Sequence, residues 1–326
     1  MYYRLLFIAI LSCMTLTGCP PGGEGGLWVE NQVISIDGVD RYFRYFIPDT
    51  LQAGAPLVFL LHGGTRGMDT LTNNQAGGPQ EWVTIAAEAG FLLVLPNGLN
   101  VDTSSPVGED QNWNDCRADA PASETFADDV SFIEDLITWA NVQHDIDTSR
   151  VYATGASNGG MMSFRLAVEL GNQIAAIAAF IANMPGDSEC GAPAVPVPAF
   201  ICNATADPLM PWAGRDAPHP RGSLLSATAT RDFWIATNGC STTPVALVDF
   251  PDLDDGEGAT VSSALYTNAG TGDAVLFLTV DGGGHTMPTI THPISDALLA
   301  LLLLGPQNHD IEGAREAWAF MKQHVR

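Results

Sequence analysis

A serine with a glycine two residues away on each side is the part of this sequence best suited to chemistry. Gly155, Ser157 and Gly159 follow an apolar run that begins at Val151, and an amphipathic segment comes after them. The pattern predicts a buried strand, a very tight turn and the start of a helix. Because glycine lets strand and helix pass closely, the serine hydroxyl would stand clear of the backbone as a candidate nucleophile.

Hydrogen-bond donors are expected beside this hydroxyl. The amide of Asn158, at the start of the helix, would point where a carbonyl oxygen gains negative charge. A second buried strand, 56–61, ends in His62 and two glycines, whose backbone can turn N–H groups toward a ligand. We expect the amides of Gly64 and Asn158 to form an oxyanion hole. There are two plainer alternatives. Ser157 could only cap the helix in a glycine-rich turn, and the loop after the other strand could be a plain glycine turn with His62 as a packed polar residue.

A carboxylate and an imidazole follow two later strands. The run 197–202 leads to Asp207, just past the edge where open α/β sheets place their sites. The run 274–280 leads through three glycines to His285, on a loop able to lean over the serine. Asp207 could instead cap the turn before Pro208, and the histidine could merely pack in a glycine turn.

Serine, aspartate and histidine occur in the order that the α/β-hydrolase fold requires. We expect His285 to take the proton of Ser157 as the serine attacks an ester carbonyl, while Asp207 orients the imidazole. The imidazole would then protonate the leaving alcohol, and water would release the acyl group. This chemistry needs no metal and no cofactor.

Alternating strand-like and helix-like segments predict the scaffold for these residues. A turn at Asp37 and Gly38 predicts an antiparallel hairpin, and the later strands are apolar runs typical of a parallel sheet. We therefore predict an α/β fold with a mostly parallel central sheet and helices on both faces. A further apolar run, 297–304, is too short to span a membrane and is expected in the core or in a lid. The expected helices are 79–89, 128–146, 158–170, 224–238 and 311–325.

The segment 99–125 is a long polar loop, and loops of this length in compact domains are often functional. Trp113 within it could line a substrate site or could simply pin the loop. His62, Met161 and Met287 are further candidates for contacts with a substrate because they stand next to the expected catalytic groups.

Composition limits the possible partners. The chain has 326 residues, 46% hydrophobic and 15% charged, which is enough for one large core and excludes a disordered chain. Its formal charge of -24 argues against nucleic acid and against anionic membrane surfaces, because both would repel it.

The N-terminus is typical of a targeting segment. Arg4 precedes the apolar run 5–16, and the sequence Leu-Thr-Gly-Cys ending at Cys19 resembles a bacterial lipobox. We expect lipid attachment at Cys19, export, and anchoring to a membrane on the periplasmic side or at the cell surface. An ordinary cleaved signal peptide is the alternative. The predicted parts are a signal peptide at 1–18, a tether at 19–26 and a catalytic domain at 27–326.

Four cysteines remain in the expected mature domain, and their spacing does not resemble a zinc site. In an exported protein they could form structural bridges, or one bridge with two free thiols. The sequence does not choose among the pairings. These residues are Cys116, Cys190, Cys202 and Cys240.

Taken together, these motifs resemble the polyhydroxybutyrate depolymerase and feruloyl esterase-like family, over about 28–325. The segments that carry the resemblance are 61–64, 155–162, 205–208, 234–240 and 282–286. The resemblance implies an α/β-hydrolase fold and an exported serine esterase. Three features depart from the family: Met287 stands where tryptophan is usual, Gly64 stands where many members carry cysteine, and the cysteine that often occurs near Ala269 is missing. A thioether offers no flat stacking surface, which weakens the expectation of an aromatic substrate. Without the cysteine near Ala269, Cys240 is expected to pair differently here or to stay free.

We therefore predict a lipid-anchored serine esterase that acts on polymer-linked esters, such as feruloyl or acetyl groups on polysaccharide, or a polyhydroxyalkanoate. The alternatives are a general carboxylesterase, a peptidase on the same three residues, or a non-catalytic lipoprotein that binds glycans. The sequence gives neither the acyl group nor the oligomeric state.

The lipobox can be tested by fractionation of the producing cells. The wild-type protein should sediment with membranes, and Cys19→Ser should appear in the soluble fraction because the acylated sulfur is gone. A Cys19→Ser protein that still sediments with membranes would contradict the predicted anchor.

Overall fold

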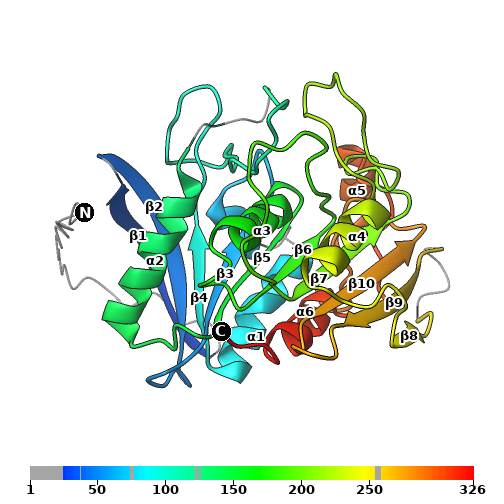
Figure 1. The fold of residues 1–326 in the computed structure, drawn as a ribbon. Coiled ribbons are helices and arrows are strands. Elements are labelled where there is room, and N and C mark those ends of the chain that lie inside the picture. Colours follow the sequence, from blue (N-terminus) through cyan, green and yellow to red (C-terminus); the bar gives the residue numbers. More distant parts are fainter. Residues whose placement is uncertain (1–24, 37, 74–76, 122–124, 126, 254–257) are drawn as a thin grey trace.

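A computed structural model describes residues 25–36, 38–73, 77–121, 125, 127–253 and 258–326. In this part of the chain ten strands form one sheet in the order β1-β2-β4-β3-β5-β6-β7-β10-β9-β8. Figure 1 shows the sheet running across the whole molecule. The predicted signal peptide and lipobox lie outside the described residues, and so do Asp37 of the predicted hairpin turn and residues 254–257.

The middle of the sheet is parallel, as the apolar runs predicted. Six neighbouring strands, from β4 through β3, β5, β6 and β7 to β10, pair in parallel. Their residues are almost all buried because helices cover both faces. The bounds are β3 Leu57–Leu61, β4 Leu92–Pro96, β5 Val151–Ala156, β6 Ala176–Phe180, β7 Ala199–Ala204 and β10 Ala274–Asp281.

Antiparallel strands extend the sheet on both sides. β1 and β2 form the predicted hairpin, and β2 joins the parallel part by pairing with β4. On the other side β9 pairs with β10, and β8 pairs with β9. The fold class is therefore confirmed: an α/β fold whose sheet is mostly parallel. The bounds are β1 Gly26–Ile36, β2 Val39–Pro48, β8 Ala246–Asp249 and β9 Thr260–Thr267.

Helices cover both faces and enclose two cores (Figure 1). One core joins α2, α3 and α4 to the sheet through Phe132, Phe164 and Trp234. The other joins α1 and α6 to the opposite face through Trp82 and Phe320. The five predicted helices are confirmed, with ends that differ by at most four residues. The bounds are α1 Glu81–Ala89, α2 Asp129–His144, α3 Asn158–Glu169, α4 Ala227–Thr237, α5 Asp296–Leu302 and α6 Gly313–Met321, with short 3₁₀ turns η1 Met68–Thr72 and η2 Gly78–Gln80.

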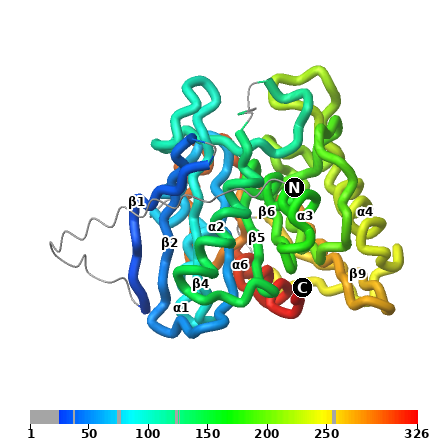
Figure 2. Tube along the Cα trace, turned by 60° about the vertical axis from the view of Figure 1, so that its left-hand side comes forward, coloured from blue at the N-terminus to red at the C-terminus, as the bar shows by residue number. Residues whose placement is uncertain are grey.

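Long loops collect at one edge of the sheet. Both views show the loop after β4 and the loop after β7 on the same side of the molecule (Figures 1 and 2). This is the edge at which the parallel strands end, and open α/β sheets place their ligand sites there. The scaffold thus brings the ends of β3, β5, β7 and β10 to one edge.

The expectation for the apolar run 297–304 was wrong in one respect. Residues 296–302 form α5, yet Leu299 is its one buried side chain, and Leu301 and Leu303 are each 77% exposed. The run is therefore not core. Among the described residues, no helix is both long enough and apolar enough to cross a membrane.

One disulfide joins two distant loops. Cys116, in the loop after β4, is bonded to Cys190, in the loop after β6. Cys202 and Cys240 are free thiols. Of the arrangements that the sequence left open, one bridge with two free thiols is the observed one.

A buried ion pair ties the hairpin to the helical layer. The guanidinium of Arg41 on β2 lies 2.5 Å from the carboxylate of Asp129 at the start of α2, and both side chains are buried. The carboxylate also accepts the backbone N–H of Asn114 at 2.8 Å, and the guanidinium lies over the ring of Phe132. Burial raises the pKa of Asp129, while Arg41 and the Asn114 amide oppose that rise. The preceding residue, Asp128, caps the helix by accepting the backbone N–H of Ser131.

We expect Arg41→Ala to lower the free energy of unfolding by about 3–5 kcal/mol, because it leaves the Asp129 charge buried without its partner. The matched control is Arg231→Ala, which removes an ion pair with the exposed Asp232 and should cost about 0–1 kcal/mol. Urea unfolding of both variants checks this, and equal losses would contradict it.

Candidate active site

Ser157 lies at the sharp turn between β5 and α3. Its backbone has φ 58° and ψ −125°, a left-handed conformation that non-glycine residues rarely adopt. The turn has no room for larger neighbours. A Cβ on Gly155 would lie 2.6 Å from the backbone of Gly159, and one on Gly159 would lie 2.3 Å from the oxygen of Leu61. The two glycines of the motif are therefore needed sterically, as predicted.

Asp207 and His285 are brought together from neighbouring strands. Asp207 follows β7, and His285 follows β10, which pairs with β7. The imidazole Nδ1 lies 2.7 Å from the carboxylate Oδ2, and the carboxylate is almost completely buried. The other oxygen, Oδ1, accepts the backbone N–H groups of Leu209 and Met210 at 2.7 and 2.8 Å. These bonds fix the carboxylate, so that it orients the imidazole.

The loop that carries His285 is tied to two other segments of the chain. The amides of Gly284 and His285 donate to the carbonyls of Pro306 and Leu304, just after α5. Farther along, Met287 packs on Gly78, which belongs to the segment that follows β3. Of the three expected catalytic residues, the contact observed among the described residues is the one between Asp207 and His285.

Gly64 and Asn158 lie side by side. A Cβ on Gly64 would lie 3.4 Å from the Cβ of Asn158, so the loop after β3 touches the first residue of α3. Within the described part of the chain, neither backbone N–H has a hydrogen-bond acceptor. Two adjacent free donors next to Ser157 are the arrangement that an oxyanion requires.

His62 and Trp113 do not reach solvent. His62 accepts the backbone N–H of Gly98 at Nε2 (2.9 Å), so its proton lies on Nδ1, which donates to the Gly63 carbonyl (2.8 Å). Trp113 stacks on this ring and donates from Nε1 to the His62 carbonyl at 2.9 Å. Both side chains are fully buried. In this structure neither side chain is exposed to a substrate; instead they position the loops after β3 and β4. The contacts of Trp113 match the alternative that it pins the loop.

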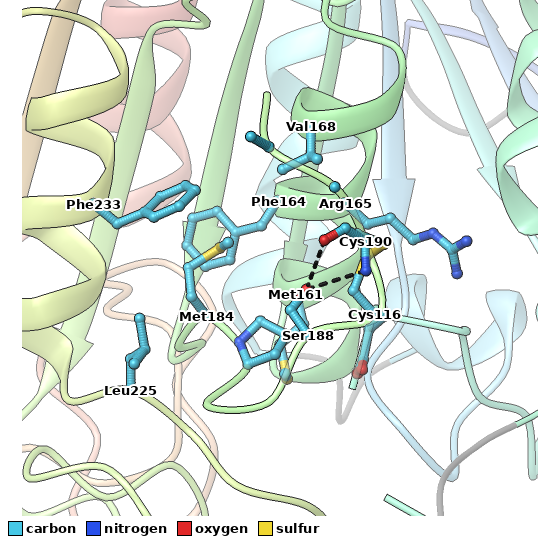
Figure 3. A pocket seen from close by; sticks show the side chains of 14 residues that line it. Cys116, Met161, Phe164, Arg165, Val168, Met184, Ser188, Cys190, Leu225 and Phe233 are labelled. Atoms are coloured by element: carbon cyan, nitrogen blue, oxygen red, sulfur yellow. Dashed lines mark hydrogen bonds between the residues drawn. A yellow bond between two sulfur atoms is a disulfide. The ribbon is translucent and has the colours of Figure 1, made fainter. Parts of the chain in front are cut away.

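The two methionine candidates lie in different surroundings. Met287 is 4% exposed and belongs to the core on the α1 side of the sheet. Met161, one helical turn after Ser157, lines a cavity of about 220 Å³ (Figure 3). The cavity lies between α3, α4 and the disulfide, with Phe164 and Met184 among its walls, and none of Ser157, Asp207 and His285 lines it.

Metal-binding side chains offer no site of their own in the described residues. The one cluster that combines three such groups is Cys116, Glu169 and Cys190. Its two sulfurs are bonded to each other, so they are not available as thiolate ligands.

Comparison with known proteins finds esterases among the relatives and among the solved structures. The model of the Dienelactone hydrolase family matches residues 80–219. A protein of Aspergillus flavus named "Probable feruloyl esterase C" is 26% identical over 88% of this chain and 93% of its own length. The poly(3-hydroxybutyrate) depolymerase of Ralstonia pickettii is 27% identical over 70% of this chain, which spans 47% of that protein. The structure of an acetyl xylan esterase from Aspergillus awamori superposes with a TM-score of 0.56 at 14% identity, covering 83% of this chain and 98% of that chain.

The chain is an esterase of the α/β-hydrolase type. The resemblance to polyhydroxybutyrate depolymerases and feruloyl esterases, noted on short motifs, thus extends over most of the chain. The acetyl xylan esterase is only 14% identical to this chain, so its similarity is evidence for the fold alone.

Some residues of the esterase's site were not singled out in the sequence. Three of them lie in the loop after β4. Asn112 lies close to Gly64, Asp115 accepts a hydrogen bond from the side chain of Asn158, and Arg117 forms an ion pair with Asp115. The run Trp-Asn-Asp-Cys could have indicated that this part of the loop is packed against the site. Residue types that are usually buried or hydrogen bonded rarely occur together in a solvated loop.

His62 gives the esterase a specific pH dependence of stability. Burial lowers the pKa of His62 to about 4, from 6.5 for an ordinary histidine. Between these values the unfolded chain binds a proton that the folded protein does not, so stability falls as the pH falls through this window. The loss should total about 3 kcal/mol.

We expect the stability advantage of the wild type over His62→Gln to shrink as the pH falls from 7 to 4, because glutamine does not titrate. Urea unfolding at both pH values measures it. His219→Gln, at a fully exposed ring, is the control and should follow the wild type. An advantage of the wild type that stays constant with pH would contradict the neutral, buried His62.

Proposed function

We propose that the esterase is a serine hydrolase of carboxylic esters whose nucleophile, base and acid are Ser157, His285 and Asp207. The observation that carries the proposal is the 2.7 Å bond between His285 Nδ1 and the buried Asp207 carboxylate. A histidine whose Nδ1 is held by a carboxylate presents Nε2 as the proton acceptor. The hydroxyl of Ser157, at the strained turn between β5 and α3, is the proposed group to be deprotonated.

In the proposed reaction, His285 Nε2 takes the hydroxyl proton as Ser157 Oγ bonds to the ester carbon. The carbonyl oxygen becomes an oxyanion, which the amides of Gly64 and Asn158 stabilise; loss of one such donor costs on the order of 3 kcal/mol. His285 gives its proton to the leaving alcohol and an acyl-enzyme remains. Water then attacks the acyl-enzyme and loses a proton to His285, which passes it to Ser157 Oγ as the carboxylic acid is released.

We propose polymer-linked esters as the substrates: feruloyl or acetyl groups on polysaccharide, or a polyhydroxyalkanoate. The names of the related feruloyl esterase and depolymerase support this class. Met161 is the proposed contact for the apolar part of the ester because it lies one helical turn after Ser157 and lines a cavity; its side chain is buried, so this contact requires the cavity to open to the substrate. Export is supported by the disulfide, because such bonds persist in oxidising compartments. The lipid anchor at Cys19 is part of the same proposal.

Ser157→Ala should lower kcat for p-nitrophenyl acetate by about 10⁴-fold or more, because the acyl-enzyme cannot form. Ser131→Ala, on α2, is the matched control and should retain the wild-type rate. Release of p-nitrophenol is the measurement, and circular dichroism checks that both variants are folded. A folded Ser157→Ala with near wild-type activity would refute the nucleophile. Methyl ferulate, acetylated xylan and hydroxybutyrate oligomers then rank the substrates.

A further inference from the structure

The two backbone N–H groups of the proposed oxyanion hole follow different strands of the sheet. Gly64 follows β3 and Asn158 follows β5, so the gap between them depends on how two separate loops are held. Donors stabilise an oxyanion only if they stay within a few tenths of an ångström of the required positions. A group that fixes one loop against the other would therefore act on the reaction without touching the substrate.

One segment of the loop after β4, residues 111–117, contacts both sides; we name it the brace. On the β3 side, the backbones of Gln111 and Arg66 exchange two hydrogen bonds of 3.1 and 3.4 Å. Trp113 donates to the His62 carbonyl, and a Cβ on Gly64 would lie 2.7 Å from Asn112 Oδ1. The brace thus fixes the loop that carries Gly64.

On the β5 side, the brace holds the side chain of Asn158 through three hydrogen bonds. The amide oxygen accepts the backbone N–H of Trp113 at 2.8 Å. The amide nitrogen donates to the Trp113 carbonyl at 3.0 Å and to Asp115 Oδ2 at 2.6 Å. The amide group of Asn158 is therefore fixed in plane and in direction, and with it the first turn of α3.

Asp115 is itself firmly held. Both of its oxygens bind the guanidinium of Arg117, at 2.8 and 2.7 Å, and both side chains are buried. Arg117 also donates to the carbonyl of Arg221, and the neighbouring Cys116 is bonded to Cys190. A charged acceptor forms a shorter and stronger bond than a neutral one, so this carboxylate restrains Asn158 more than a backbone carbonyl would.

We infer that Asp115 is a positioning residue of the reaction: through the side chain of Asn158 it holds the backbone N–H of Asn158 in register with that of Gly64. The inference rests on the proposed function, in which these two amides stabilise the oxyanion. It assigns to the long polar loop an indirect part in transition-state stabilisation, with the disulfide between Cys116 and Cys190 as the support of the brace.

The test is a double-mutant cycle on kcat and KM for p-nitrophenyl acetate, with Asp115→Ala, Asn158→Ala and the double variant. Asp115→Ala should lower kcat between about 10-fold and 10³-fold, the upper limit being loss of a whole donor, and leave KM within about twofold. The double variant should lose little more than the worse single variant, because both substitutions break the same contact. Losses that multiply, or a KM that rises as much as kcat falls, would overturn the inference.

The matched control is Asp119→Ala. Asp119 lies in the same loop and accepts the backbone N–H of Ser223, but it has no bond to Asn158. Its kcat should stay within about threefold of the wild type. A loss equal to that of Asp115→Ala would show that any loosening of the loop suffices, and it would refute a specific role of Asp115.

Asp115→Asn guards against a variant that does not fold, because it keeps the size and one acceptor oxygen. The kcat of Asp115→Asn should lie between those of the wild type and Asp115→Ala. A folded Asp115→Asn with wild-type kcat would show that the charge of Asp115 is not needed to position Asn158, and it would overturn that part of the inference. Ser157→Ala separates the two proposals. If it abolishes activity while the Asp115 losses multiply, the nucleophile stands and only the positioning role is lost.

Discussion

The constraint on which the rest of the structure depends is the lack of space at the end of β5. The backbone reverses at Ser157 with a positive φ, and α3 starts immediately against the end of β3. A Cβ on Gly160 would lie 2.7 Å from that of Ala182, so the segment after β6 presses on the same point. Three neighbouring strand ends thus meet where a side chain larger than glycine cannot fit.

This crowding explains the electrostatics of the site. The first amides of α3 cannot be capped by the Ser157 side chain, which accepts no capping bond, and they remain available for an anion. The strain is compensated elsewhere: Ser157 donates its own N–H to the Phe180 carbonyl, and Asn158 is hydrogen bonded to the loop after β4. A buried polar network in which every group has a hydrogen-bond partner is rigid. Removing some of its hydrogen bonds costs more free energy than the sum of the single bonds.

The sequence was sufficient for the features that depend on local pattern. Apolar runs located the parallel strands, and chain order joined Ser157, Asp207 and His285 into one expected site, of which the Asp207–His285 contact is observed. It was insufficient where the outcome depends on contacts between distant segments. The pairing of Cys116 with Cys190 spans 74 residues, and the burial of Trp113 requires His62 beneath it. Hydrophobicity alone also misplaced the leucines of α5, because a short apolar run looks alike in a core and on a surface.

The free thiol of Cys202 sits in the middle of β7, between β6 and β10, in the strand that leads to Asp207. It is 1% exposed, and burial raises its pKa to about 12. Cys240 is only half-buried. An alkylating reagent must therefore reach Cys240 first, whereas Cys202 becomes reactive only when β7 separates from its neighbours. The rate at which Cys202 is alkylated therefore reports how often the sheet opens beneath the candidate active site. Mass spectrometry can measure this rate without an engineered label.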